Sequence, residues 1–140
     1  MNKIAVVYWS GTGNTEAMAV AVADGAKNSG AEVTMMVAAE FGAEQLAAFD
    51  AIAFGCPAMG AEALEETEFE PMFSALESQL SGKRIALFGS YGWGDGEWMR
   101  SWEESCRRAG AVLADESVIC CGAPEEDTLQ QCSALGGNLA

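Results

Sequence analysis

The chain contains no histidine, which removes the side chain that most often serves as a general base. No uninterrupted apolar run approaches 18 residues, so the sequence predicts no membrane span. The first four residues lead directly into a strand-like apolar segment and do not resemble the long apolar stretch of a signal peptide. These absences favour a cytoplasmic protein.

Basic side chains are also scarce. Seven lysine and arginine residues stand against 21 aspartate and glutamate residues, which gives a formal net charge of −14. A surface of this charge repels nucleic acid and anionic membranes, so neither is expected as a partner. A basic protein that docks transiently on an acidic face is expected instead. The alternative is that the charge serves only to keep the protein in solution.

The cysteines form no recognisable metal or redox motif. They number five, no two have CxxC spacing, and no histidine accompanies them, which argues against a zinc site and a thioredoxin-type dithiol. Neighbouring side chains of a strand point to opposite faces, so a disulfide between Cys120 and Cys121 is not expected. We expect reduced thiols at all five positions, namely Cys56, Cys106, Cys120, Cys121 and Cys132.

Half of the 140 residues are hydrophobic, which is enough for a single domain over residues 1–140 with a sizeable core. Short apolar segments alternate with segments of helical spacing. The last of these helical segments is expected to end at Gly136 and Gly137. The predicted strands are 4–9, 32–37, 51–56, 84–90 and 112–120, and the predicted helices are 14–28, 71–80, 98–109 and 128–135, with a short turn at 44–48.

The third and fourth of these strands are almost continuously apolar, which is typical of parallel strands covered by helices on both faces. The alternating order of strands and helices therefore predicts a doubly wound α/β sheet. In such sheets, ligands bind beyond the carboxyl ends of the strands, where the winding reverses. We expect the loops after the first, third and fourth strands to converge there.

The loop after the first strand is rich in small donors. Residues 8–15 read YWSGTGNT and include no lysine or arginine. Backbone N–H groups and hydroxyls at a helix N-terminus bind phosphate. The third glycine of a dinucleotide fingerprint is absent, and Gly82-Lys83 is followed by Arg84 where a Walker loop has Ser or Thr. The loop thus favours a phosphate that is held permanently over one that is transferred, and the alternative is a merely capped turn.

The loop after the third strand, residues 57–62 (PAMGAE), offers groups that suit a planar ring. Met59 supplies a polarisable surface for an aromatic ring, and Gly60 permits the following peptide to turn over. Glu62 can accept a hydrogen bond from a ring N–H. Taken alone, the segment fits a surface turn with a solvated Glu62 equally well.

The loop after the fourth strand is more informative. Residues 90–98 (SYGWGDGEW) place Trp93 among three glycines, where an aromatic face can stack on a ligand. A phosphate site, an aromatic face and a Met-Gly-x-Glu turn together describe a pocket for a planar phosphorylated cofactor. Flavin mononucleotide (FMN) fits each part.

The three motifs together resemble the flavodoxin family in its short-chain bacterial form. YWSGTGNTE at 8–16, GCPAMGAE at 55–62 and FGSYGWGDGEWM at 88–99 match the family's pattern at its usual separations, and the resemblance spans the whole chain. It implies a five-stranded parallel sheet of order 2-1-3-4-5 with helices on both faces, flavodoxin being the type example of FMN bound between strands one and three.

The resemblance also implies a function. Flavodoxins are monomeric, low-potential one-electron carriers without a substrate of their own. They bind FMN non-covalently and shuttle electrons between redox partner proteins that dock on an acidic face near the flavin. They cycle mainly between the neutral semiquinone and the anionic hydroquinone.

Roles for individual residues follow from the same resemblance. The side chains of Ser10, Thr12, Asn14 and Thr15, with nearby amides and Ser90, would hold the phosphate. The complete cofactor-binding set that it implies is Ser10, Gly11, Thr12, Gly13, Asn14, Thr15, Pro57, Ala58, Met59, Gly60, Ala61, Glu62, Ser90, Tyr91, Gly92, Trp93 and Gly94.

The flavin ring would lie between the second and third loops. Met59 and Trp93 would flank its two faces, and Glu62 would accept a hydrogen bond from flavin N3–H. Backbone amides within 92–94 would approach the pyrimidine edge. On reduction, the peptide after Gly60 would turn its carbonyl toward flavin N5–H.

Two positions depart from the family pattern. Ala61 stands where relatives often carry a polar residue, and Pro57 replaces a serine of some relatives, which removes a phosphate donor and a backbone N–H. Neither departure argues against cofactor binding, but both bear on the redox potential.

Two other functional classes share this topology. An FMN-dependent quinone or NAD(P)H reductase is disfavoured because the chain has no candidate base for a substrate and no dinucleotide fingerprint. A regulatory or phosphatase module would need a phosphate-accepting carboxylate at the end of the third strand or a cysteine loop with an arginine. The sequence has Gly55-Cys56-Pro57 there, and Glu62 where the arginine would stand.

A last hypothesis concerns the charges of the third loop. No basic residue lies in any of the three loops. Asp95 and Glu97, with Glu62, are therefore expected to lower the potential of the second reduction by repulsion, an effect that shrinks with salt.

Overall fold

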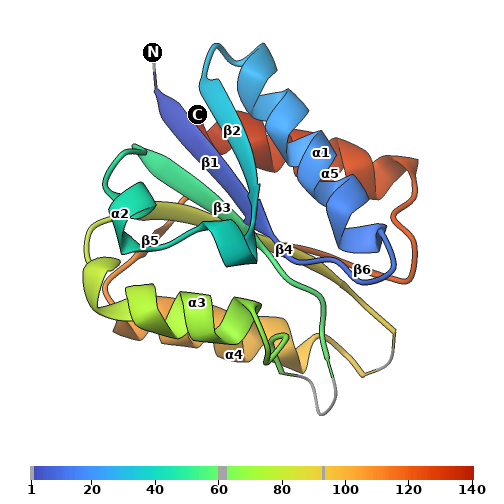
Figure 1. Ribbon diagram of the computed structural model, residues 1–140. Helices are drawn as coiled ribbons and strands as arrows, with labels where there is room; N and C mark the ends of the chain where they lie inside the picture. Colours follow the sequence, from blue (N-terminus) through green and yellow to red (C-terminus); the bar gives the residue numbers. More distant parts are fainter. Residues whose placement is uncertain (1, 60–62, 93) are drawn as a thin grey trace.

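A computed structural model describes residues 2–59, 63–92 and 94–140. Six strands form one sheet in which every pairing is parallel, and helices cover both faces (Figure 1). The strands are β1 (Lys3–Tyr8), β2 (Glu32–Val37), β3 (Ala51–Gly55), β4 (Arg84–Tyr91), β5 (Val112–Leu113) and β6 (Val118–Cys121). The order β2-β1-β3-β4-β5 confirms the expected 2-1-3-4-5 sheet.

The helices lie in two layers. Helices α1 (Asn14–Asn28) and α5 (Glu126–Leu139) cover one face of the sheet, and α3 (Phe69–Leu76) and α4 (Glu97–Arg108) cover the other (Figure 1). A four-residue helix, α2 (Ala43–Leu46), precedes β3, and short 3₁₀ turns follow β2 at Ala38–Glu40 and α3 at Glu77–Gln79. None of the helices that the structure describes combines the length and the apolar character needed to cross a membrane.

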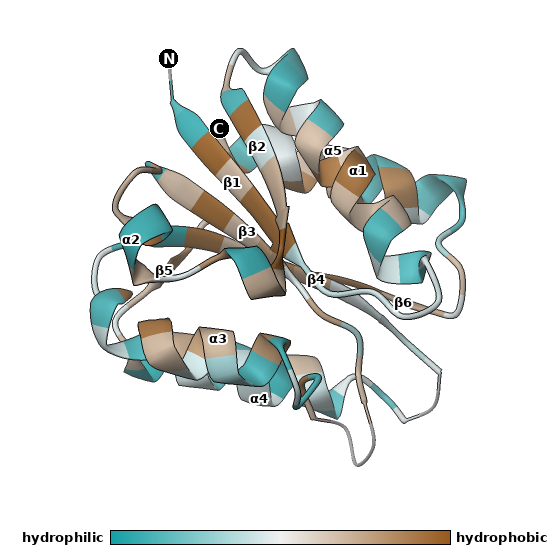
Figure 2. Cartoon of the chain, viewed as in Figure 1, coloured by the Kyte–Doolittle hydropathy of each residue, from teal (hydrophilic) through white to brown (hydrophobic). Residues whose placement is uncertain are grey.

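Alternating side chains of the strands fill two separate cores. In β3, Ala51 and Ala53 face α1 and α5, whereas Ile52 and Phe54 face α3 and α4, and all four are buried. In this strand, small residues thus meet one helix pair and large ones meet the other. The strands accordingly show mostly hydrophobic colours, while hydrophilic colours gather on the outer faces of the helices (Figure 2).

The prediction of one continuous fifth strand is wrong, because two short strands occupy this segment. β5 pairs with the first half of β4 at Arg84–Ile85 and β6 with the second half at Phe88–Tyr91, so the two short strands share the edge of the sheet. Between them lies the polar segment Asp115-Glu116-Ser117, in which Ser117 Oγ donates to a carboxylate oxygen of Glu103 at 2.7 Å. Charged residues break an edge strand readily because the outer side of its backbone faces solvent.

The predicted end of the last helix is also wrong. α5 continues through Gly136 and Gly137 to Leu139. A Cβ atom at Gly136 would lie 2.0 Å from the carbonyl oxygen of Val22, and one at Gly25 would lie 1.9 Å from that of Ser133. These glycines allow α1 and α5 to touch backbone to backbone, so they serve helix packing and do not end the helix.

The other helices follow the prediction, except that α3 ends at Leu76, short of the predicted residue 80, and is followed by a 3₁₀ turn. α1 begins after Gly13, which has a φ of 96°, and ends before Gly30, which has a φ of 95°. α3 starts two residues earlier than predicted, so Pro71 lies in its first turn, where a proline costs no helical hydrogen bond. In the second helix layer, Phe69 and Phe73 each pack edge to face against Trp102, with ring centroids 5.4 and 5.6 Å apart.

Candidate functional site

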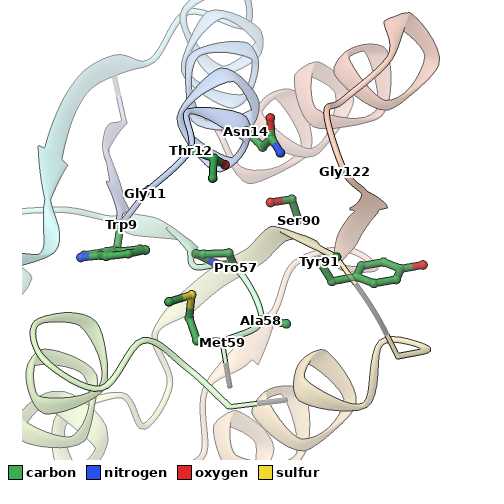
Figure 3. A pocket seen from close by; sticks show the side chains of 11 residues that line it. Trp9, Gly11, Thr12, Asn14, Pro57, Ala58, Met59, Ser90, Tyr91 and Gly122 are labelled. Atoms are coloured by element: carbon green, nitrogen blue, oxygen red, sulfur yellow. The ribbon is translucent and has the colours of Figure 1, made fainter. Parts of the chain in front are cut away.

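The loops after β1, β3 and β4 meet at the carboxyl edge of the sheet, as the topology predicts. They enclose a cleft of about 250 Å³ (Figure 3). None of the described residues that line it carries a charge. They are Trp9, Gly11, Thr12, Asn14, Pro57, Ala58, Met59, Ser90, Tyr91, Gly92 and Gly122.

Nine of the residues that the sequence singled out line this cleft, and the others fall into two groups. Gly11, Thr12, Asn14, Pro57, Ala58, Met59, Ser90, Tyr91 and Gly92 belong to the lining. Ser10, Gly13, Thr15 and Gly94 do not belong to it. Gly60, Ala61, Glu62 and Trp93 lie outside the described residues, so the turn of the Gly60–Ala61 peptide and the stacking role of Trp93 stay predictions.

The first loop is a compact turn held by its own side chain. Ser10 Oγ accepts a hydrogen bond from the backbone N–H of Gly13 at 3.0 Å. The carbonyl oxygen of Gly13 then accepts the N–H of Ala17, which starts α1. The first N–H groups of a helix have no acceptor within the helix, and they carry the positive end of its dipole. Thr12 and Asn14 stand at this end of the cleft (Figure 3).

A pair of buried hydroxyls fastens this loop to β4. Thr15 Oγ1 and Ser90 Oγ lie 3.2 Å apart, and their residues are 1% and 5% exposed. One hydroxyl donates to the other, which leaves the second hydrogen free to donate to a further acceptor. Ser90 also lines the cleft, so the pair can present a donor there.

The second loop is tied to its neighbours on both sides. The N–H of Ala58 donates to the carbonyl oxygen of Ser90 at 3.0 Å. Met59 and Ala63 exchange two backbone hydrogen bonds of 2.8 and 2.9 Å, which join the two ends of the segment between them. Met59 is 38% exposed, a high value for so apolar a side chain, and it faces the cleft. This placement leaves a polarisable surface available to an aromatic ligand.

Close backbone contacts position the strand end that leads into the second loop. Trp98 Nε1 donates to the carbonyl oxygen of Cys56 at 3.2 Å. A Cβ atom at Gly89 would lie 2.1 Å from that same oxygen, so only glycine fits there. Trp98 also packs against Tyr91, with ring centroids 5.4 Å apart. Trp98 is 2% exposed, in agreement with the packing role implied by its position in α4.

In the third loop, a nearby arginine partly neutralises the acidic side chains that the sequence places there. Arg100 reaches back from α4, and its Nη2 lies 3.0 Å from Oδ1 of Asp95 and 3.0 Å from Oε2 of Glu97. The hypothesis of uncompensated charge at Asp95 and Glu97 therefore needs correction. Sequence inspection of the loop alone missed Arg100 because it lies in the first turn of the following helix.

Two lining residues were not predicted as site residues. Trp9 follows β1 directly, and Gly122 follows β6. Trp9 could have been predicted from the first motif, since an aromatic residue at a strand end beside a phosphate loop can form a wall of a ligand site. Gly122 could not have been predicted, because nothing in its own segment shows that β6 ends beside Tyr91.

The five thiols are all free, in agreement with the expectation of no disulfide between Cys120 and Cys121. Burial raises the pKa of Cys56, Cys106 and Cys132 to about 12 in each case. These three are protonated and unreactive near neutral pH, and only Cys121 is exposed.

The cleft fits a phosphorylated planar ligand on the chemistry of its donors. One end offers hydroxyls, an amide side chain and a helix N-terminus without a basic residue, which suits a phosphate that stays in place. The other end offers a thioether and aromatic surfaces. These are the features that FMN requires.

Comparisons with known proteins agree with this arrangement. The flavodoxin family model matches residues 6–136. A flavodoxin of Clostridium beijerinckii is 44% identical over 135 residues, which cover 96% of this chain and 97% of that protein. A flavodoxin of Megasphaera elsdenii is 41% identical over 95% of both chains.

Solved structures show the same fold. The solution structure of two-electron reduced Megasphaera elsdenii flavodoxin has a TM-score of 0.89 at 42% identity and covers 97% of each chain. A flavodoxin from the domain Archaea has a TM-score of 0.86 at 29% identity, over 99% of this chain and 96% of that one.

Proposed function

Because the chain belongs to the flavodoxin family, we propose that it is an electron carrier that binds FMN non-covalently and has no substrate of its own. The 140 residues form one FMN-binding domain in this proposal. The observation that carries it is the cleft whose described lining bears no charge, which joins a helix N-terminus at one end to Met59 and Tyr91 at the other.

The chain's own residues divide the work of holding the cofactor. Thr12, Asn14 and the Thr15–Ser90 pair bind the phosphate together with the N–H groups at the start of α1. Met59 covers one face of the flavin ring, with Trp93 opposite and Glu62 as the acceptor for the ring N–H. FMN itself supplies reversible one-electron chemistry, and the protein supplies binding, orientation and a shielded environment.

We further propose that the protein works at low potential, between the neutral semiquinone and the anionic hydroquinone. The absence of any charged residue among the described cleft lining supports this, because no cation there stabilises the anion. The net charge of −14 adds a general penalty for further negative charge.

The partners in this proposal are basic redox proteins that dock transiently on the acidic surface near the flavin. The protein acts as a monomer in the cytoplasm. Electrostatic attraction speeds such encounters and weakens as salt is added. The rate of electron transfer to a basic cytochrome should therefore fall steadily as ionic strength rises.

A visible spectrum and a reductive titration test the central claim. The purified protein should show flavin bands, and stepwise reduction should produce the blue neutral semiquinone. The apoprotein should bind FMN about a hundredfold or more tightly than riboflavin, since riboflavin lacks the phosphate and its charge-assisted hydrogen bonds. Equal affinity for the two flavins would contradict the proposed phosphate site. Rapid oxidation of NAD(P)H by the protein alone would favour a reductase instead.

A further inference from the structure

The indole of Trp9 is held at one end by a hydrogen bond, and its other end occupies space that a side chain at position 11 would need. Its Nε1–H donates to Oε1 of Glu68 at 3.0 Å. At the other end of the ring, a Cβ atom at Gly11 would lie 3.1 Å from Cη2 and 3.3 Å from Cζ3. Trp9 stands on one side of the cleft and Tyr91 on the other (Figure 3).

Gly11 thus has a role besides phosphate binding. Its φ is not in the left-handed region that favours glycine, so backbone strain does not explain the residue. The contact distances do, because a side chain there would press on the six-membered ring of Trp9. The first glycine of the motif leaves room for the indole.

The backbone at Glu68 is held by a hydrogen bond to Glu65. Its backbone N–H donates to Oε1 of Glu65 at 2.8 Å, and Glu65 is 4% exposed. The Glu65 carboxylate also accepts from Thr67 and from the N–H of Phe69 at 2.9 Å, which satisfies the start of α3. The N–H of Glu65 donates to Cys56 Sγ at 3.3 Å. The segment that carries Glu68 is therefore fastened to the end of β3.

We propose that Glu68 is a positioning residue for the cofactor cleft, which fixes the indole of Trp9 as one of its walls. The role rests on the proposed function and deepens it. Glu68 lies outside the cleft lining and 59 residues from Trp9 in sequence. It acts only through the indole, and through it the beginning of α3 helps to shape the site.

Variants at Glu68 separate this role from a simple charge effect. Glu68→Ala removes the acceptor, whereas Glu68→Gln keeps a carbonyl oxygen that can accept from Nε1–H. Glu70→Ala is the matched control, because this carboxylate lies two residues away on α3, bonds Ser74 Oγ instead, and carries the same charge. Trp9→Phe removes the donor and keeps an aromatic ring.

The first measurement needs no cofactor. In a ¹H–¹⁵N NMR spectrum of the apoprotein, the Trp9 Nε1–H signal should shift in Glu68→Ala, keep close to its position in Glu68→Gln, and be unmoved in Glu70→Ala. An unmoved signal in Glu68→Ala would overturn the proposal, since the hydrogen bond would then not hold the ring in solution.

The second measurement is the dissociation constant for FMN. Glu68→Ala and Trp9→Phe should each weaken binding by about fivefold, which is typical for one partly exposed hydrogen bond to a charged acceptor. The double variant should lose no more than either single one, because both remove the same interaction. Glu68→Gln should bind within about twofold of the unaltered protein.

The outcomes distinguish this inference from the proposed function. Tight FMN binding by the unaltered protein with equal losses in Glu68→Ala and Glu70→Ala would overturn the role of Glu68 alone. Additive losses in the double variant would do the same. Failure of the unaltered protein to bind FMN would overturn the proposed function, and with it the role of the Trp9 wall.

Discussion

Thr15 and Ser90 touch through their hydroxyl oxygens at 3.2 Å, although 75 residues separate them in sequence. The pair joins the start of α1 to the end of β4 and is almost fully buried. It is thus both part of the fold and a source of one donor for the cleft. Its two roles lead to a prediction.

Thr15→Val should weaken both the fold and cofactor binding. Valine matches the shape of threonine but leaves Ser90 Oγ without its partner, which costs about 1–2 kcal/mol of unfolding free energy. Urea unfolding of the apoprotein measures that cost, and titration with FMN measures the affinity. Thr34→Val is the control, since Thr34 is exposed on β2 and the same change should be nearly neutral there. Equal effects at the two positions would contradict the importance of the buried pair.

The buried carboxylate of Glu65 predicts a loss of stability in acid. Burial acts to raise its pKa, but hydrogen bonds from Thr67, Phe69 and Glu68 outweigh burial and lower the pKa to about 2 from 4.5. A lowered pKa means that the stabilisation is complete above pH 4.5 and is lost as the pH falls toward 2. The ionised carboxylate contributes on the order of 2 kcal/mol to the free energy of unfolding.

Glu65→Gln should remove this dependence. Its amide N–H₂ would face backbone donors, so the variant should be less stable at pH 7, and the gap should narrow between pH 4.5 and 2. Thermal unfolding across this range measures the effect. Glu66→Gln, at an exposed neighbouring carboxylate, should follow the unaltered protein. A pH profile unchanged in Glu65→Gln would contradict the assignment.

The thiols should differ sharply in reactivity. Burial raises the pKa of Cys56, Cys106 and Cys132 to about 12, whereas Cys121 is exposed. At pH 8, iodoacetamide should label Cys121 first and the half-buried Cys120 more slowly, and the other three only in denaturant. Mass spectrometry of digested protein identifies the labelled sites. Labelling of Cys132 as fast as Cys121 would contradict the described packing around α5.

The same buried thiols should lower stability in alkali. A raised pKa means that the neutral form is favoured in the folded state, so stability is complete below pH 9 and declines as the pH rises from there toward 12.

The cleft was predictable from sequence because its determinants are local. Alternating strands and helices predict a parallel sheet, and a parallel sheet brings its carboxyl ends to one edge. The composition of the first loop then indicated phosphate without reference to any other residue. Most of the lining follows from these two steps.

The parts that sequence reasoning missed depend on contacts between distant segments. Gly122 lines the cleft only because β6 pairs with the second half of β4. Glu65 is buried only because the start of α3 folds around it. Gly136 resembles a helix end in sequence, and only the approach of α1 shows its purpose. Local propensity cannot reveal a residue whose role is set by its neighbour's backbone.

The close contact of α1 and α5 gives a matched pair of glycine variants. Gly136→Ala places a Cβ atom 2.0 Å from the Val22 carbonyl, so the helices must separate, at a cost of about 1–3 kcal/mol or more. Gly137→Ala meets the Gly25 carbonyl oxygen at an ordinary 3.7 Å and is tight only against Ser29 Oγ at 3.0 Å, a side chain that can move. It should gain up to about 1 kcal/mol from helix propensity. Chemical denaturation of both variants decides, and equal stability would contradict the packing role of Gly136.

The position of Arg100 leads to a prediction about the reduction potential of the bound cofactor. Hydrogen bonds with Asp95 and then Glu97 raise the pKa of its guanidinium, so it stays charged at all working pH values. Arg100→Gln exposes the two carboxylates that it neutralises, and it should lower the potential of the reduction step that leaves the cofactor negatively charged. Asp95→Asn should shift the potential upward. Potentiometric titration at low ionic strength measures both, and the shifts should shrink as salt rises. Arg108→Gln makes the same change of charge about 12 Å further along α4 and should have the smaller effect, most clearly near 0.1 M salt, where the Debye length is about 10 Å. If the two arginine variants shift the potential equally, the effect comes from net charge and the Asp95–Arg100–Glu97 cluster has no special part in it.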